Sequence, residues 1–307
     1  MKIQRILLYL VIPASLFLYS CQKEMSTERG IIINTPTTSF GADSIYLDKI
    51  FAIDSSGSTI DSGYFLFNYD GQKRINNIVI KTSPDATDSV FWLKFSYNGN
   101  DSLPYFIRHV LDSSDYYCDY NSTGKLVRDS VISYGASGGG ADEIKVTHLS
   151  YTVDKIYADI SNSTTGAANL VPAYKDTLNL DARGNVIRSV DYFKDFLTGN
   201  YDLSNKTIST FDNNLSPYTR VSGFNMFILA YNIPFLNYDN VFTKNNELTN
   251  TDSYYTTTGG STTLFDTRLV TYTNTYYPNS FLKRAISVTT GPFTSGYSDW
   301  KYYYKSL

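Results

Sequence analysis

Apolar and polar residues alternate along much of the chain with a period of two. Phe91, Leu93 and Phe95 occupy every second position of one segment, and residues 116–120 repeat the pattern. Such alternation is typical of a β-strand with one buried face and one solvated face. A single stretch, residues 190–197, could form one short helix. The pattern therefore predicts an all-β protein.

Polar turns separate the predicted strands, and several of them share a sequence pattern. An aromatic or aliphatic residue is followed by Asp or Asn, then by polar residues with Gly, at 69–75, 97–100, 120–126 and 180–186. The Asp or Asn side chain can cap such a turn, and Gly can take its positive-φ position. We expect antiparallel hairpins that pair edge to edge into one extended, twisted sheet. A β-sandwich and a partly closed barrel are the alternatives.

Composition supports a β fold and limits the class of partner. The 307 residues include 28 Tyr and 18 Phe but only 2 Trp, and Tyr favours half-buried strand positions. The net charge is −3, and the chain has no basic cluster. Nucleic acid is therefore not an expected partner.

The N-terminal segment has the features of an export signal. Lys2 and Arg5 precede an apolar stretch at 6–19, which is shorter than a membrane-spanning helix requires. The sequence Leu18-Tyr19-Ser20-Cys21 resembles the lipobox of bacterial lipoproteins. That resemblance implies cleavage before Cys21 and a lipid anchor on its sulfur and amine. The expected organisation is a signal peptide at 1–20, a lipidated Cys with its tether at 21–43, and an antiparallel β domain at 44–307.

The expected location is the outer membrane, with the lipid on Cys21 as the contact with the bilayer. Gln22-Lys23-Glu24 resembles the surface-export signal of some Bacteroidota lipoproteins, so exposure on the cell surface is the alternative to a periplasmic position. Cys118 is the only other cysteine. Once Cys21 carries lipid, Cys118 has no partner within the chain, so no disulfide framework is expected.

The turn motifs also resemble a known family. Phe67-Asn68-Tyr69-Asp70, residues 117–121 and residues 272–278 look like the tyrosine–aspartate hairpins of YD/RHS-like repeats, as found in uncharacterised Bacteroidota lipoproteins. The resemblance covers roughly residues 64–305. It implies an antiparallel fold and an anchored location, and it implies no catalytic residues.

Few residues suggest chemistry, and we expect neither a cofactor nor a metal. Gly135-Ala136-Ser137-Gly138-Gly139 has the letters of a nucleophile elbow, but strands are predicted on both sides where the elbow needs a helix after the Ser. His109 and His148 lack the spacing of metal ligands, so we interpret both as ordinary sheet-surface residues.

Two functional hypotheses remain. The first is a non-enzymatic envelope protein that binds a glycan or an outer-membrane protein, or serves a structural role. The second is a glycan-acting hydrolase that uses a pair of Asp residues as acid and base. A modification is also predicted, because several Asp-Ser/Thr-apolar triplets resemble O-glycosylation acceptors of Bacteroides-type bacteria. Their acceptor residues are Ser44, Ser89, Ser102, Ser130 and Thr177.

Overall fold

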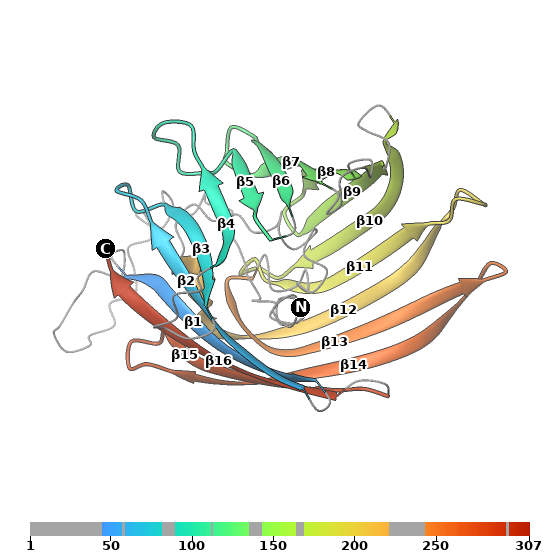
Figure 1. Cartoon of the computed structure of the whole chain (residues 1–307). Coiled ribbons are helices and arrows are strands. Elements are labelled where there is room, and N and C mark those ends of the chain that lie inside the picture. The colour runs from blue at the N-terminus through green and yellow to red at the C-terminus, as the bar shows by residue number, and fades with distance from the viewer. Residues whose placement is uncertain are drawn as a thin grey trace.

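The protein folds as one closed antiparallel β-barrel (Figure 1). This computed structural model describes residues 45–56, 59–81, 90–111, 113–134, 143–163, 169–220, 243–292 and 295–307. Within these segments it has sixteen strands and one 3₁₀ turn. The all-β prediction is confirmed.

The strands follow one another around the wall in chain order. Their bounds are β1 (Ile45–Ser56), β2 (Thr59–Tyr69), β3 (Ile75–Lys81), β4 (Val90–Ser96), β5 (Phe106–His109), β6 (Ser114–Tyr120), β7 (Leu126–Ser133), β8 (Glu143–Tyr151), β9 (Lys155–Ser163), β10 (Val171–Leu180), β11 (Val186–Lys194), β12 (Tyr201–Leu215), β13 (Asn245–Thr258), β14 (Ser261–Tyr276), β15 (Leu282–Thr290) and β16 (Ser295–Ser306). The 3₁₀ turn η3 (Pro217–Arg220) follows β12.

The first and last strands close the barrel. β1 pairs with β16 along its whole length, from Ile45 opposite Ser306 to Ser56 opposite Gly296. An ion pair of 2.9 Å between Lys305 and Asp48 joins the same two strands. The prediction of an open, extended sheet was therefore wrong. On the inner face, Ala52 of β1 stands opposite Trp300 of β16, and both are buried. These side chains bury each other only when the two distant strands pair.

The short helix expected at 190–197 was also wrong. Residues up to Lys194 belong to strand β11, and a turn follows. The Asp195 carboxylate caps that turn by accepting the backbone N–H of Leu197 at 2.8 Å. Ser189 and Asp191, two residues apart, are both buried on the inner face. Inward and outward positions therefore alternate along this segment with the period of a strand and not with that of a helix.

Three of the predicted turns are built alike, at the same end of the barrel. Asp70, Asn121 and Asp181 each accept the backbone N–H groups two and four residues further along the chain, at 2.8–3.0 Å. The fourth turn residue has a positive φ, which Gly124 and Gly184 adopt without strain. In the turn at 70–74 that position is Lys73, with φ 64°, rather than Gly71.

Lys73 therefore offers a test of the turn geometry. A left-handed conformation costs a non-glycine residue about 1–2 kcal/mol. We expect Lys73→Gly to raise the free energy of unfolding by up to about 1 kcal/mol, because the entropy of the new glycine offsets part of the gain. Urea unfolding would measure the change. Gln72→Gly, one residue earlier in the turn, is the control and should destabilise; equal effects would contradict the turn geometry.

Tyrosine hydroxyls tie neighbouring strands together beside these turns. The hydroxyl of Tyr69 donates to the Leu47 carbonyl at 2.7 Å, that of Tyr97 to Ile75 at 2.8 Å and that of Tyr151 to Leu126 at 2.6 Å. Each bond runs from the end of one strand to the backbone of the preceding strand. Phe could pack in the same place but could not donate this bond, which gives a structural reason for part of the high Tyr content.

The inner face of the barrel holds the hydrophobic core. Residues directly opposite each other on adjacent strands share a face, and Phe65, Ile50 and Tyr302 form such a row across β2, β1 and β16. All three side chains are buried. The same core continues over β3–β10 through Leu93, Leu178 and other buried apolar side chains. The inner wall over β1–β10 therefore carries most of the buried apolar side chains, with buried polar ones such as Asp129 and Thr147 among them.

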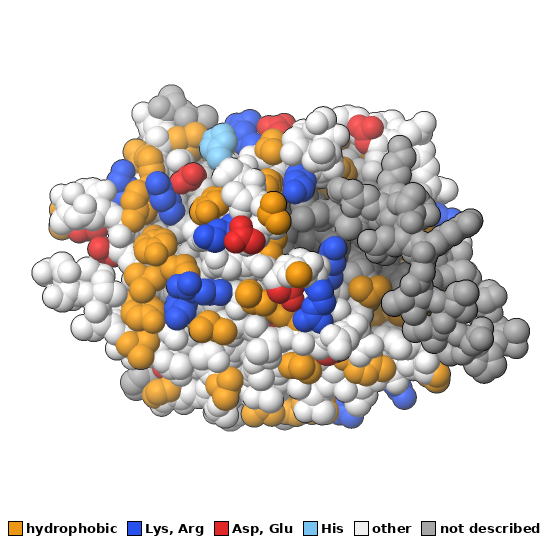
Figure 2. Space-filling view, turned by 180° about the vertical axis from the view of Figure 1, so that it is seen from behind, with side chains coloured by type: hydrophobic (Ala, Val, Ile, Leu, Met, Phe, Trp, Pro, Cys, Tyr) orange, Lys and Arg blue, Asp and Glu red, His pale blue; other side chains and the backbone are white. Residues whose placement is uncertain are grey.

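The outer face carries charged side chains in ion pairs. Arg128 and Asp119 lie 3.1 Å apart, Lys175 and Asp159 3.6 Å apart, and Arg284 and Asp299 2.7 Å apart. Figure 2 shows Lys, Arg, Asp and Glu side chains scattered among hydrophobic ones over the outer surface. Among the described residues, no helix combines the length and the apolar character needed to cross a membrane.

Candidate functional site

The inner wall changes character between β10 and β15. Here the inward positions are mostly polar, and the hydroxyl of Thr207 donates to Asp252 at 2.7 Å while the amide of Asn205 donates to Asp191 at 3.3 Å. Asn250 lies on the same face and is fully buried. We call this set of inward-facing polar side chains the polar inner strip. Its hydrogen-bonding groups make it a candidate site, because a purely structural core would be expected to be apolar.

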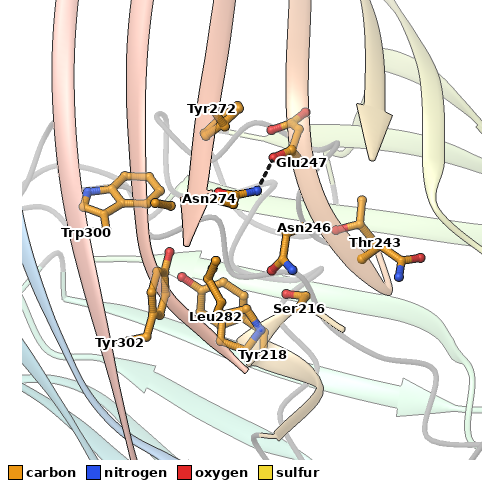
Figure 3. Close-up of a pocket in the computed structure, with 13 residues that line it drawn as sticks. Ser216, Tyr218, Thr243, Asn246, Glu247, Tyr272, Asn274, Leu282, Trp300 and Tyr302 are labelled. Carbon is orange, nitrogen blue, oxygen red and sulfur yellow. Dashed lines mark hydrogen bonds between the residues drawn. The ribbon is translucent and has the colours of Figure 1, made fainter. Parts of the chain in front are cut away.

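A small cavity lies between the strip and the core, against η3 (Figure 3). Its volume is about 30 Å³, which is room for about two water molecules. Tyr218 of η3 and Tyr302 of β16 form the apolar side, with their rings 6.3 Å apart and nearly perpendicular. Asn246, Glu247 and other side chains of the polar strip form the opposite side.

A network of amide side chains holds the segment that enters β13 against the wall. The Asn185 side-chain oxygen accepts the backbone N–H groups of Lys244 and Asn245 at 2.9 and 3.0 Å. Asp212 accepts the backbone N–H of Asn246 at 3.2 Å and also the hydroxyl of Tyr276. These bonds link the turn before β11, and the strands β12 and β14, to the start of β13, and so they position Glu247 beside the cavity.

Among the described residues that line the cavity, Glu247 is the one carboxylate. Its Oε1 accepts the side-chain amide of Asn250 at 3.2 Å, and its backbone carbonyl accepts the amide of Asn274 at 2.9 Å. Burial raises the pKa of Glu247 to about 7, while hydrogen bonds from Ser209, Asn250 and Tyr272 act in the lowering direction. Near neutral pH this side chain can therefore hold or release a proton next to the cavity.

Stability should depend on pH through Glu247. Its pKa rises from 4.5 to about 7 on folding, so the folded state is increasingly disfavoured as pH rises through that interval. Glu247→Gln cannot ionise. We expect this variant to gain roughly 3 kcal/mol over wild type at pH 8 and nothing at pH 4. Urea unfolding at both values tests this, with the exposed Glu143→Gln as control. Parallel pH profiles for Glu247→Gln and wild type would contradict it.

The position of Glu247 could not be read from strand alternation. Strict alternation from the inward-facing Asn250 would place Leu248 inside and Glu247 outside. The register shifts between Thr249 and Glu247, so Leu248 is exposed while Glu247 and Asn246 are buried. A bulge of this kind leaves no clear trace in a single sequence.

The two histidines lie on opposite faces of the wall and on different strands. His109 of β5 is buried beside Trp92, whose ring centroid is 6.1 Å away. His148 of β8 is exposed and stands opposite Arg128 on the outer face. The sheet-surface interpretation is therefore right for His148 and wrong for His109, and the two cannot form one site.

Other predicted residues are placed only in part. Cys21, Ser44, Ser89 and Ser137 lie outside the described residues. Ser102 lies in the loop between β4 and β5, and Ser130 and Thr177 lie on the outer face of β7 and β10. Among the residues described, no group of three or more His, Cys, Asp or Glu is arranged to hold a metal ion.

Solved proteins with a similar fold are known. A crystal structure of a porin-like protein from Bacteroides vulgatus matches with a TM-score of 0.52 and 14% identity, over 85% of this chain and 99% of that chain. A second porin-like protein, from Bacteroides uniformis, matches with a TM-score of 0.48 and 10% identity, over 84% and 96% of the two chains.

The first of these likenesses supports the barrel fold alone, and the second, with its lower score, adds no argument. No protein-family model matches the chain, and no curated protein is significantly similar to it. Nothing in these comparisons supports the resemblance to YD/RHS-like repeat proteins. The shared turn motifs are explained by hairpin geometry, because each one closes a turn at the same end of the barrel.

Proposed function

We propose that the chain is a lipid-anchored envelope protein whose barrel lies outside the bilayer and serves binding or structural interaction. The observation that carries this proposal is the charged outer wall, with Asp159–Lys175 and Asp119–Arg128 on the outer face. The likeness to the porin-like protein from Bacteroides vulgatus is consistent with an envelope location.

Two charges at the middle of the wall favour water over lipid on this part of its outer side. Barrels that span a membrane present an apolar band about 25 Å tall, and Arg or Lys at the midplane costs about 2–4 kcal/mol. Asp159 lies at the middle of β9, with its side chain 64% exposed, and Lys175 lies at the middle of β10. A bilayer around this barrel would have to cover both charges.

The inner wall supports the same proposal. Membrane channels line their lumen with polar side chains. Here Phe65, Leu93 and Leu178 belong to one buried apolar cluster on the inner face. An apolar cluster of this kind resembles the core of a water-soluble domain more than the polar lining of a channel, over the part of the wall that it covers.

The anchor can be tested on the whole chain by fractionation. Lipidated Cys21 should be the only link to the membrane, so Cys21→Ser should move the protein from the membrane fraction to the soluble fraction. Cys118→Ser replaces a buried cysteine and is the control that should stay with the membrane. Retention of Cys21→Ser in the membrane fraction, with the protein folded and residues 1–20 removed, would contradict the anchor.

An aromatic cluster on the outer wall is a candidate binding surface for a glycan or an envelope protein. Tyr105 and Tyr117 are 42% and 43% exposed and flank Phe106, with ring centroids 6.4 and 5.2 Å from it. Sugars and protein side chains can stack on such faces. The two tryptophans, Trp92 and Trp300, are buried, so they are not part of that surface. A two-carboxylate hydrolase gains no support from the cavity, because Glu247 is the only carboxylate among the described residues that line it.

O-glycosylation remains part of the proposal. Ser102, Ser130 and Thr177 are partly exposed, so their hydroxyl groups are accessible for glycosylation in the folded barrel. Intact-mass measurement of the protein from its own cells should show added hexose-type masses that fall stepwise in Ser102→Ala and Thr177→Ala variants. An unmodified mass would contradict this part while leaving the anchor untouched.

A further inference from the structure

The turn between β11 and β12 presents two large apolar side chains to solvent. It spans residues 195–200 and lies at the right of Figure 1. Leu197 is 97% exposed and Phe196 is 62% exposed. Side chains exposed to this degree contribute little to the core of the barrel. Apolar groups that gather on a surface mark a contact with a partner or with a membrane.

Hydrogen bonds within the turn hold these two side chains outward. The Asp195 carboxylate accepts the backbone N–H of Leu197 and the hydroxyl of Thr198, both at 2.8 Å. The backbone carbonyl of Asp195 accepts the N–H of Gly199 at 2.7 Å, and its N–H donates to the Asn200 carbonyl at 2.8 Å. The turn therefore needs little further ordering to make a contact, and its carboxylate already has two donors.

The exposed tip continues into an aromatic cluster at the same end of the barrel. The ring of Phe196 lies 5.8 Å from that of Phe193, which lies 5.6 Å from that of Tyr174. Phe193 and Tyr174 are 38% and 37% exposed. The planes of successive rings meet at 79° and 55°, so the three rings form no common platform on which a glycan could stack. Ring edges beside an aliphatic Leu197 are better suited to acyl chains.

Cationic and phenolic groups flank this apolar tip. The ammonium groups of Lys175 and Lys194 lie 4.7 and 5.8 Å from the centre of the Tyr201 ring, and Lys175 also lies 3.6 Å from Asp159. Tyr is enriched where a membrane meets water, and Lys can extend toward lipid phosphates. The turns at the other end of the barrel, at 70–74, 121–125 and 181–185, contain no large apolar residue.

We propose that the turn at 195–200 inserts Phe196 and Leu197 into the interfacial region of the membrane and so orients the barrel. This inference rests on the proposed function, because the lipid on Cys21 brings the barrel to that membrane. A single acyl chain binds a membrane only marginally. Two apolar side chains therefore orient the protein without holding it, and Asp159, at mid-wall, stays in water.

Maleimide labelling of the full-length lipidated protein tests the insertion. Leu197→Cys should react slowly with a water-soluble maleimide until detergent is added, both in membrane fragments and after purification into phosphatidylethanolamine–phosphatidylglycerol vesicles. Val153→Cys, fully exposed at the opposite end of the barrel, should react rapidly throughout. Equal rates at the two positions before detergent would overturn the proposal. Protection in fragments but not in vesicles would also overturn it, because a protein would then cover the turn.

A second substitution tests whether apolar burial causes the protection. Phe196→Ser, added to Leu197→Cys, should raise the labelling rate before detergent roughly tenfold, because most of the apolar contact is lost. Tyr105→Ser, which removes an exposed aromatic ring elsewhere on the wall, should leave the rate unchanged. An unchanged rate with Phe196→Ser would overturn the insertion.

The failure of this inference can be told apart from the failure of the proposed function by labelling Asp159→Cys in the same fragments. Rapid labelling at both 159 and 197 would overturn the insertion alone. Protection at both positions would mean that lipid covers the wall, and it would overturn the proposed function together with the insertion.

Discussion

A disulfide across the closing seam is expected to stabilise the barrel strongly. Phe51 and Lys301 stand opposite each other on the outer face of β1 and β16, with the Lys301 ammonium 5.6 Å from the Phe51 ring. In the variant Phe51→Cys/Lys301→Cys, the bond would close a loop of about 250 residues. The chain-entropy model gives such a loop up to about 5 kcal/mol of stabilisation, measured as the difference between oxidised and reduced protein in urea.

The matched control uses the same β1 position and the other neighbouring strand. Tyr64 is also opposite Phe51, and Phe51→Cys/Tyr64→Cys closes a loop of only about 14 residues. That bond should add about 3 kcal/mol whether or not the barrel closes. If the 51/64 bond forms readily and the 51/301 bond does not, the closed barrel is contradicted.

Truncation of Phe65 is expected to cause the largest loss of stability. This side chain is 1% exposed on the inner face of β2 and packs edge-on against Trp92, with ring centroids 5.4 Å apart. Phe65→Ala should cost about 3–5 kcal/mol, since it removes buried contacts and leaves a cavity. Tyr64→Ala, the next residue on the outer face, is the control. Equal losses for the two variants in urea unfolding would show that the inner face of β2 is not the core.

The strands and turns could be predicted from the sequence because they depend on local patterns. Alternation at Phe91–Phe95 and the Asp or Asn caps at Asp70, Asn121 and Asp181 each involve neighbours in the chain. The closure of the barrel could not be predicted in this way. It depends on the pairing of Ile45–Ser56 with the last strand, and any other arrangement of hairpins would show the same alternation.

The cavity and its carboxylate were beyond sequence analysis for a related reason. Glu247 faces inward only because the register shifts between it and Thr249. A carboxylate pair for hydrolysis was a hypothesis drawn from the abundance of Asp, yet the turn residues Asp70, Asp181 and Asp195 cap backbone N–H groups. Composition shows how many carboxylates exist but not which of them are already used by the backbone.

The proposed lipid anchor and the charges on the outer wall are connected by a simple physical relation. A barrel whose outer surface prefers water needs another means of staying at a membrane, and two or more acyl chains on Cys21 would provide stable attachment. Position 159 tests this account most directly, because it lies at mid-wall.

The most direct measurement is the labelling rate of Asp159→Cys by a water-soluble maleimide in membrane fragments. Native Cys118 is buried in the core, so the unsubstituted protein provides the background. A barrel outside the bilayer should be labelled at position 159 at the same rate before and after detergent is added. Labelling that appears only after detergent would show that lipid covers the wall, and it would contradict the account.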